Sequence, residues 1–271
     1  MELQPNPVIQ RYLRQGKKLP AFFCPGCEVG IVMGALIRAL NACNLQKDEI
    51  FLVSGVGCSG RIPMYIDTCS IQAPQGMALT IAAGVKLAKP HLKVVVLLGD
   101  GDALSFGGNA LLHACIRNIG LTAIILNGAS MSISGGQPSP TTPYGKVTSF
   151  APYGNPNHPV NIGKLLESAG GTFFGRQTVY YAQELAQLIE TAIKHNGFSV
   201  VEAAMICHVR PQKSDPVKAL EHLRDIAVPV EKASKLNREK LAGKIVTGII
   251  YRSARPELTE EYEKASKKIR G

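Results

Sequence analysis

Residues 94–108 read VVVLLGDGDALSFGG, in which five aliphatic residues run directly into a Gly-Asp-Gly turn. A continuous aliphatic run is typical of a strand that is buried on both faces of a parallel sheet. In open α/β sheets, ligands bind at the carboxyl ends of the strands, which is where this turn lies. Glycines let the backbone approach phosphate oxygens, and an aspartate there can bind Mg²⁺. The stretch is therefore either a diphosphate site or an ordinary glycine-rich connection from a strand to a helix.

Helix-like and strand-like segments alternate on both sides of this turn. Helices are expected at 29–43, 78–89, 107–119 and 182–196, and strands at 50–56, 94–100, 122–127 and 198–206. This alternation predicts an α/β protein with a doubly wound, mostly parallel sheet. After Pro211 the sequence becomes charge-rich and helical. We therefore predict an α/β domain over residues 1–210 and a C-terminal helical arm or docking segment over residues 211–271.

The composition limits the classes of protein and partner. The chain has 271 residues, 45% of them apolar, and no apolar run reaches the ~18 residues of a membrane span. The N-terminal segment lacks the apolar core of a secretion signal, so we expect a cytoplasmic protein with no membrane span. The formal net charge of +10 comes without a nucleic-acid-binding signature, so we expect no nucleic-acid partner. It fits either a basic face for an acidic protein partner or a merely basic surface.

A second polar segment follows the next predicted strand, which ends at Asn127. Because neighbouring parallel strands end at the same edge of a sheet, Asp100 and Asn127 are expected to lie close together. Residues 126–143 read LNGASMSISGGQPSPTTP and contain no charged residue. Backbone amides and small hydroxyls of this kind can receive the anionic oxygens of a diphosphate. The hydroxyls available there include those of Ser130, Ser132 and Ser134.

Four of the seven cysteines lie at the same kind of boundary, between a strand and a helix. Cys24 and Cys27 form a C-x₂-C turn just ahead of a helix. Cys58 lies in a glycine-rich turn after a strand, and Cys207 follows the last clear strand. Four thiolates suit a [4Fe–4S] cluster or Zn²⁺, and the C-x₂-C pair alone also suits a thioredoxin-like dithiol. The remaining cysteines are expected to be small buried residues: Cys43, Cys69 and Cys115.

Together these motifs resemble the β subunits of the 2-oxoacid:ferredoxin oxidoreductases. The resemblance runs through FCPGCEVGIVMGALIRAL (23–40), VSGVGCSGRIPMYID (53–67), ALTIAAGVKLAKP (78–90), GDGDALSFGGNALLHACIRNI (99–119), SGGQPSPTTPYG (134–145) and TGIIYRSARPELTEEY (247–262). It implies a thiamine diphosphate-binding fold that carries thiamine diphosphate, Mg²⁺ and a proximal [4Fe–4S] cluster. It also implies an α or fused α/γ partner subunit, CoA and a 2-oxoacid bound through the complex, and ferredoxin or a similar acidic electron carrier. The implied reaction is oxidative decarboxylation of the 2-oxoacid to an acyl-CoA, with electrons leaving one at a time.

The resemblance also implies roles for individual residues. The cluster ligands would be Cys24, Cys27, Cys58 and Cys207, and the Mg²⁺ ligands would be Asp100, Asn127 and Ser130. Thiamine diphosphate would contact Cys58, Ser59, Gln75, Gly99, Asp100, Gly101, Asp102, Asn127, Ser130, Ser132 and Ser134. The substrate would contact Arg61, a cation suited to a carboxylate, and Ile133.

Some positions depart from the family pattern. The family usually has Asn-Asn where this chain has Asn127-Gly128, and Thr-His-Gly-Arg where residues 74–77 read PQGM. Gly128 offers no side-chain oxygen, and Gln75 and Met77 replace a histidine and an arginine. Each lost charge-assisted hydrogen bond is worth about 1.5–3 kcal/mol, so weaker cofactor binding is expected. The alternatives are a divergent electron-transfer or scaffold subunit that keeps the cluster without thiamine catalysis, and a zinc-bound structural module.

Overall fold

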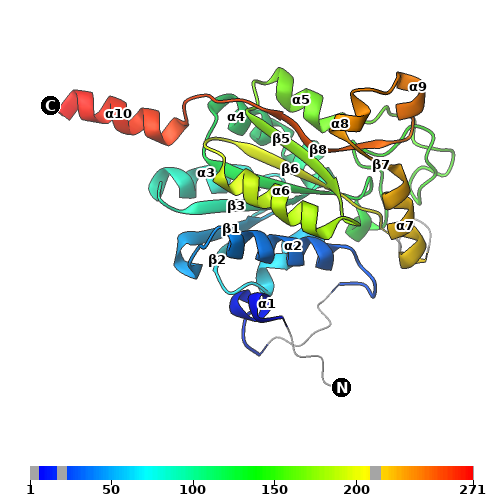
Figure 1. Cartoon of the computed structure of the whole chain (residues 1–271), viewed down its shortest axis with the longest axis horizontal. Helices are drawn as coiled ribbons and strands as arrows, with labels where there is room; N and C mark the ends of the chain where they lie inside the picture. The colour runs from blue at the N-terminus through cyan, green and yellow to red at the C-terminus, as the bar shows by residue number, and fades with distance from the viewer. Residues whose placement is uncertain (1–5, 17–22, 208–214, 271) are drawn as a thin grey trace.

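An eight-stranded β-sheet forms the centre of the computed structural model, which describes residues 6–16, 23–207 and 215–270 (Figure 1). Within these residues the strand order is β2-β1-β3-β4-β6-β5-β8-β7. The strands are β1 (Ile50–Ser54), β2 (Cys69–Gln72), β3 (Lys93–Gly99), β4 (Leu121–Asn127), β5 (Phe173–Thr178), β6 (Ser199–Ala204), β7 (Ala227–Pro229) and β8 (Ile245–Arg252). Neighbours from β2 to β5 run parallel, whereas β8 is antiparallel to β5. The sheet is mostly parallel, which confirms the predicted fold class.

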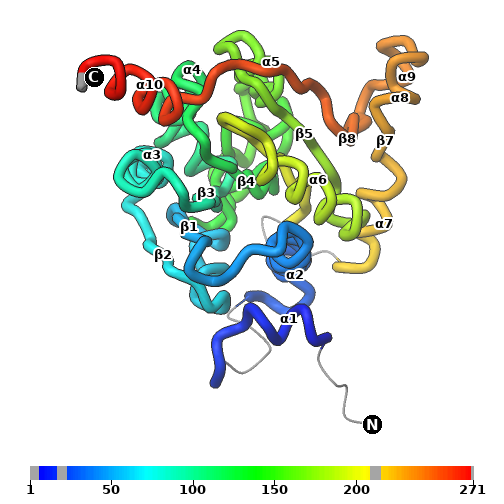
Figure 2. The backbone as a smooth tube through the Cα atoms, turned by 60° about the vertical axis from the view of Figure 1, so that its left-hand side comes forward, coloured from blue at the N-terminus to red at the C-terminus, as the bar shows by residue number. Residues whose placement is uncertain are grey.

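Helices cover both faces of this sheet (Figures 1 and 2). One face packs on α1 (Pro7–Tyr12), α2 (Val29–Ala42), α6 (Ala182–Lys194) and α7 (Pro216–Ile226). The other face packs on α3 (Ala78–Ala88), α4 (Gly108–Arg117) and α5 (Ile162–Ser168). Alternate residues of β3 enter the two cores, with Val95 and Leu97 in the first and Val94, Val96 and Leu98 in the second. Each is at most 2% exposed, so the aliphatic run is buried on both faces as its sequence predicts.

The carboxyl ends of four adjacent strands position the candidate site. The turn after β1 carries residues 55–58, the turn after β3 carries the Gly-Asp-Gly motif, and the segment after β6 leads to Cys207. After β4 the chain enters the hydroxyl-rich segment, where Ser132–Ser134 forms a short helical turn. Asp102–Phe106 forms a turn of π-helix after β3, a feature that is frequent at functional sites. Because β1, β3, β4 and β6 are parallel neighbours, these segments meet at one edge of the sheet.

The C-terminal segment both extends the sheet and forms a projecting helix. The predicted boundary between residues 210 and 211 falls within 208–214, which lie outside the described residues. After β7, α8 (Val230–Ala233) and α9 (Arg238–Leu241) lead into β8, which pairs with β5. The charge-rich pattern of this segment indicates an arm but not this strand. Among the described elements, α10 (Leu258–Arg270) is the one that projects from the body of the protein (Figure 1).

The cysteines outside the predicted cluster set differ in exposure. All seven cysteines are among the described residues, and each is a free thiol. Cys115 is buried as expected and Cys43 is partly buried, but Cys69 is exposed. Cys69 lies on β2, an edge strand whose residues are all exposed, so the expectation of a buried side chain is wrong there. As for membranes, none of the described helices combines the length and the apolar character that crossing a bilayer requires.

Candidate functional site

A cavity of about 360 Å³ opens at the carboxyl edge of the sheet, a volume suited to a small-molecule site. Most of the residues proposed from the sequence line it, namely Cys24, Cys27, Cys58, Ser59, Arg61, Gln75, Gly99, Asp100, Gly101, Asp102, Ser130, Ser132, Ile133, Ser134 and Cys207. Asn127 ends β4 but does not line the cavity. Apolar residues that no sequence motif indicated complete the walls: Val29, Val56, Leu126, Met131, Met205 and Ile206.

One side of the cavity is rich in thiols. The turn of Cys24 and Cys27 is closed by a hydrogen bond from the Cys27 N–H to the Cys24 carbonyl oxygen at 2.9 Å. Burial is the main cause that raises the pKa of the Cys27 thiol to about 11; the other three cysteines contribute to the rise, and a hydrogen bond from the Val29 backbone opposes it. Burial also raises the pKa of the Cys58 thiol, and the Arg61 guanidinium opposes that shift. Four thiols from three segments of the chain therefore act on one another across a single cavity.

Four thiols that line one cavity are a donor set that a [4Fe–4S] cluster or a Zn²⁺ ion can use. Within the described residues, no three His, Cys, Asp or Glu side chains are arranged to hold one metal ion. Structural Zn²⁺ needs four ligands converging on one centre. A [4Fe–4S] core is larger and is held by four cysteine thiolates spread around it. The cysteine side of the cavity is thus compatible with an iron–sulfur cluster.

Glu28 joins two of the cysteine-bearing segments. Its carboxylate is 1% exposed, and its Oε2 atom accepts the Ile206 N–H at 2.7 Å. It thereby ties the turn that ends at Cys27 to the segment just before Cys207. Burial raises the pKa of the Glu28 carboxyl to about 7, and its Oε1 atom has no hydrogen-bond partner among the described residues. Sequence reasoning missed this residue because a glutamate at the start of a helix is usually solvated.

The Asp100 carboxylate, which also lines the cavity, is held by two hydroxyls. It is 3% exposed, and its Oδ2 atom accepts hydrogen bonds from Ser139 Oγ and Thr141 Oγ1, each at 2.6 Å. Burial raises the pKa of Asp100, and these two hydrogen bonds oppose the rise. Thr141 Oγ1 also lies 2.8 Å from Asn127 Oδ1. Because a hydroxyl has one proton, it donates to one of these acceptors at a time and links Asp100 to Asn127.

Asn127 is held from behind by the ion pair of Arg176 and Glu202. Its Nδ2 atom donates to Glu202 Oε1 at 2.8 Å, and its Oδ1 atom accepts the Ala129 N–H at 3.0 Å. Glu202 Oε2 in turn accepts from Arg176 Nε at 2.7 Å. Arg176 and Glu202 are cross-strand neighbours on β5 and β6. Asn127 is therefore near Asp100 as predicted, and its carboxamide contacts Glu202, Ala129 and Thr141.

Three buried polar atoms around the cavity have no hydrogen-bond partner among the described residues. They are Ser59 Oγ, Asp102 Oδ2 and Ser130 Oγ, and all three residues line the cavity. The other Asp102 oxygen accepts the Gly76 N–H at 2.8 Å. A buried polar atom without a partner costs about 1–3 kcal/mol, so a bound polar ligand would relieve this cost. The two hydroxyls can donate to anionic oxygens such as those of a diphosphate.

The departures from the family pattern lie at and near this polar side. Gly128 lines the cavity, and a Cβ atom placed there would meet only Met205 Cγ, at 4.0 Å. The glycine is therefore not required for steric reasons. Gln75 also lines the cavity, whereas Met77 lies outside it and is 45% exposed. The site has lost potential polar contacts without being filled by bulkier side chains.

Comparisons with known proteins match this chain over most of its length. The family described as "Thiamine pyrophosphate enzyme, C-terminal TPP binding domain" matches residues 55–203. The 2-oxoglutarate synthase subunit KorB of Archaeoglobus fulgidus is 44% identical over 214 residues, which cover 79% of each chain. The KorB subunit of Methanocaldococcus jannaschii is 36% identical over 264 residues, which cover 96% of this chain and 97% of the relative.

A solved structure agrees with these relatives. The 2-oxoglutarate:ferredoxin oxidoreductase from Magnetococcus marinus, with 2-oxoglutarate, coenzyme A and succinyl-CoA bound, has a TM-score of 0.87 and 27% identity. The match covers 97% of this chain and 91% of the other. The likeness thus extends to the cysteine-bearing ends, which lie outside the residues of the thiamine pyrophosphate domain. The chain carries a thiamine pyrophosphate-binding domain and belongs to the β subunits of the 2-oxoacid:ferredoxin oxidoreductases.

Proposed function

We propose that this chain, with an α or fused α/γ subunit, oxidatively decarboxylates 2-oxoglutarate or a related 2-oxoacid and transfers the acyl group to CoA. The reaction breaks the bond between the carboxylate and the ketone carbon, releases CO₂, forms a thioester and gives up an electron pair. The observation that carries the proposal is that four cysteines and the Gly-Asp-Gly turn line the same cavity. The names of the relatives and the ligands of the Magnetococcus marinus enzyme support 2-oxoglutarate as the first substrate to test.

The polar side of the cavity would hold thiamine diphosphate, which when bound supplies an electron sink for the decarboxylation. The glycine amides of the turn after β3 and the hydroxyls of Ser59 and Ser130 would receive the diphosphate oxygens. Asp100 and a main-chain oxygen at Ser130 would hold Mg²⁺, whose preference is for oxygen ligands. Asn127 would act through Thr141 by orienting the Asp100 carboxylate. Further contacts would come from Gln75, Ser132 and Ser134 to the cofactor, and from Arg61 and Ile133 to the substrate.

The thiol side would hold a [4Fe–4S] cluster through Cys24, Cys27, Cys58 and Cys207. Placing an electron acceptor in the same cavity as the decarboxylation site lets electrons leave singly without crossing solvent. The net charge of +10 favours ferredoxin or another acidic carrier as the external acceptor, because opposite charges steer encounter. Glu28 would hold the two cysteine-bearing segments together through its hydrogen bond to the Ile206 N–H.

The proposal is tested on the anaerobically purified complex of this chain with its partner subunit. Iron, sulfide and thiamine are measured first, and 2-oxoglutarate and CoA are then added while visible absorbance and electron paramagnetic resonance are recorded. We expect the cluster to become reduced when 2-oxoglutarate is added, and the acyl-CoA to form once CoA is also present. Pyruvate in place of 2-oxoglutarate tests the breadth of the substrate class. A complex that contains iron but never binds thiamine diphosphate would instead favour the electron-transfer or scaffold alternative.

Replacing Gly128 with asparagine is expected to tighten Mg²⁺-dependent thiamine diphosphate binding about tenfold. The added carboxamide supplies the oxygen that the family pattern has at this position, and one such contact is worth about 1.5 kcal/mol or more. The position has room, since a Cβ atom would meet only Met205 at 4.0 Å. Titration calorimetry of the complex with and without Mg²⁺ measures the change. Gly128→Ala is the matched control, and equal affinities for the two variants would contradict the assignment of this position to the metal.

A further inference from the structure

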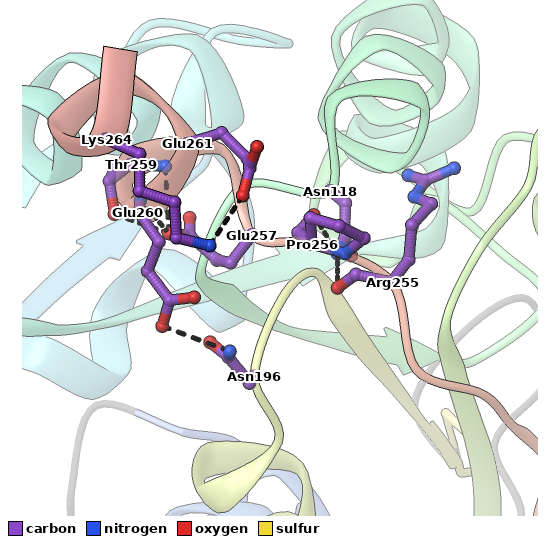
Figure 3. Close-up of polar contacts among 9 residues, drawn as sticks. All are labelled: Asn118, Asn196, Arg255, Pro256, Glu257, Thr259, Glu260, Glu261 and Lys264. Atoms are coloured by element: carbon purple, nitrogen blue, oxygen red, sulfur yellow. Dashed lines mark hydrogen bonds and ion pairs between the residues drawn. The ribbon is translucent and has the colours of Figure 1, made fainter. Parts of the chain in front are cut away.

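The strap that leads from β8 to α10 is fastened to the amino edge of the sheet, away from the cavity. Asn118 Nδ2 donates to the carbonyl oxygens of Arg255 and Pro256, each at 3.0 Å (Figure 3). The Arg255 guanidinium donates to the carbonyl oxygens of Cys115 and Ile116 at 2.7 and 3.0 Å. The strap is therefore bound to the end of α4 and to the turn that precedes β4.

Glu257 fixes the direction in which α10 leaves this strap. Its Oε1 atom accepts the Gly120 N–H at 2.7 Å, just before β4. Its Oε2 atom accepts the N–H groups of Thr259 and Glu260 at 2.8 and 3.1 Å, which lie in the first turn of α10. A second tie runs from Asn196 Nδ2 to Glu260 Oε1 at 3.1 Å (Figure 3). One buried carboxylate thus caps the helix and holds it to the body at the same time.

Beyond this base, α10 is open to solvent. Figure 1 shows the helix extending away from the body, and no other helix or strand of the described residues packs extensively against it. Tyr262 is 63% exposed and Ile269 is 86% exposed. A helix of 13 residues is marginal in water unless an apolar face is buried. A firmly anchored helix that leaves two large apolar side chains exposed is expected to be covered by a partner.

The sequence of α10 indicates what covers it. Its exposed apolar residues, Tyr262, Ala265 and Ile269, follow one another at spacings of three and four residues, as in the seam of a coiled coil, whereas Leu258 at the base packs against the chain's own core. Glu261 and Lys268 occupy equivalent positions on one flank of this seam, one near the base and the other near the tip. When two such helices pair antiparallel, Glu261 of each copy lies beside Lys268 of the other. Parallel pairing would leave both charges without an opposite partner across the seam.

We propose that α10 is a self-association element through which two copies of this chain pair antiparallel about a two-fold axis. The pairing is self-complementary in both seam and charge, as a two-fold interface requires. The ion pair between Glu261 and Lys264 within one helix is exposed and weak, so it does not compete strongly with the contact between copies. Because α10 leaves from the amino edge of the sheet, the pairing keeps the cavity at the carboxyl edge free for the catalytic partner subunit.

The test is sedimentation velocity of the full chain over a broad concentration series, with charge-reversed variants. Glu261→Lys and Lys268→Glu each place like charges across the seam, and each is expected to weaken dimerisation about tenfold. Mixing these two variants brings opposite charges together again and should restore the dimer. The double variant E261K/K268E should also form a dimer as tightly as the unchanged chain.

Lys267→Glu is the matched control, because Lys267 lies on the outer side of the helix relative to the seam. It makes the same change in net charge and should leave the dimer unaffected. A chain that stays monomeric at every concentration would overturn the proposal. So would a mixture of the two single variants that dimerises no better than either alone, which would indicate that α10 binds a different subunit.

Discussion

Replacing Cys58 with serine is expected to abolish electron transfer through the subunit and to remove most of its iron. The Cys58 thiol lines the same cavity as the three other proposed cluster ligands, and it comes from the turn after β1. A serine hydroxyl is a hard, protonated group and a poor ligand for iron that prefers soft thiolate. With one ligand missing, one iron of a four-iron cluster has no cysteine thiolate. We expect such a cluster to be lost during purification. Iron and sulfide per chain, visible absorbance and reduction of an electron acceptor by 2-oxoglutarate and CoA measure the effect.

Cys43→Ser is the matched control for this experiment. Cys43 is also a partly buried free thiol, but it follows α2 and contacts the Glu190 carbonyl oxygen at 3.9 Å. It does not line the cavity, so its replacement should leave the iron content and the electron transfer unchanged. If Cys58→Ser keeps its full iron content, or if Cys43→Ser loses iron equally, the assignment of the four ligands is wrong.

The sheet and the location of the cavity follow from the sequence because both depend on short-range patterns. The aliphatic run from Val94 to Leu98 requires burial on both faces, which only a central strand of a covered sheet provides. Parallel strands then bring their carboxyl ends to one edge, so motifs far apart in the chain become neighbours. This is why Cys58, Asp100 and Cys207 could be expected to converge before any coordinates were known.

The hydrogen bonds behind the cavity could not be predicted in the same way. The hydroxyls of Ser139 and Thr141 belong to a loop whose sequence indicates mobility as readily as contact with Asp100. Arg176 and Glu202 meet because β5 and β6 pair in one particular register, and a shift of a single residue would separate them. Such partners depend on strand order and register, which single-sequence patterns do not specify.

The strand β8 shows a second limit of prediction from the sequence. Its sequence, IVTGIIYR over residues 245–252, has a strand-like composition but lies within a charge-rich segment and is interrupted by Gly248. Glycine inside a strand pattern weakens the expectation of a strand. Here Gly248 has a φ of +108°, and the register against β5 shifts between Phe174 and Gly175. The glycine therefore lies beside an irregularity of the antiparallel pairing, and the charge-rich sequence around the strand made the whole segment look like an arm.

Replacing Arg176 with methionine is expected to lower the free energy of unfolding by about 3–5 kcal/mol. The side chains of Arg176 and Glu202 are 18% and 5% exposed, so the substitution leaves a carboxylate in the sheet without its cation. Methionine keeps an unbranched apolar chain but removes the guanidinium that lies 5.4 Å over the Phe174 ring, so the cost arises from the lost charge and its contacts. Chemical denaturation of the chain, read from the midpoint and slope of the transition, measures the change.

Two controls separate the effect of an uncompensated carboxylate from the loss of an ion pair in general. They are the double variant R176M/E202Q and a substitution in the exposed pair Lys47–Asp67. Removing both charges takes away the uncompensated carboxylate, so the double variant should recover much of the stability lost by Arg176→Met. Lys47 and Asp67 lie 2.6 Å apart but are 45% and 49% exposed, so Lys47→Met should cost less than about 1 kcal/mol. Because Glu202 also holds the Asn127 carboxamide at 2.8 Å, Arg176→Met should disturb Asn127 and, through Thr141, Asp100. If Arg176→Met and Lys47→Met lower the free energy of unfolding equally, the uncompensated Glu202 carboxylate is not the cause of the destabilisation.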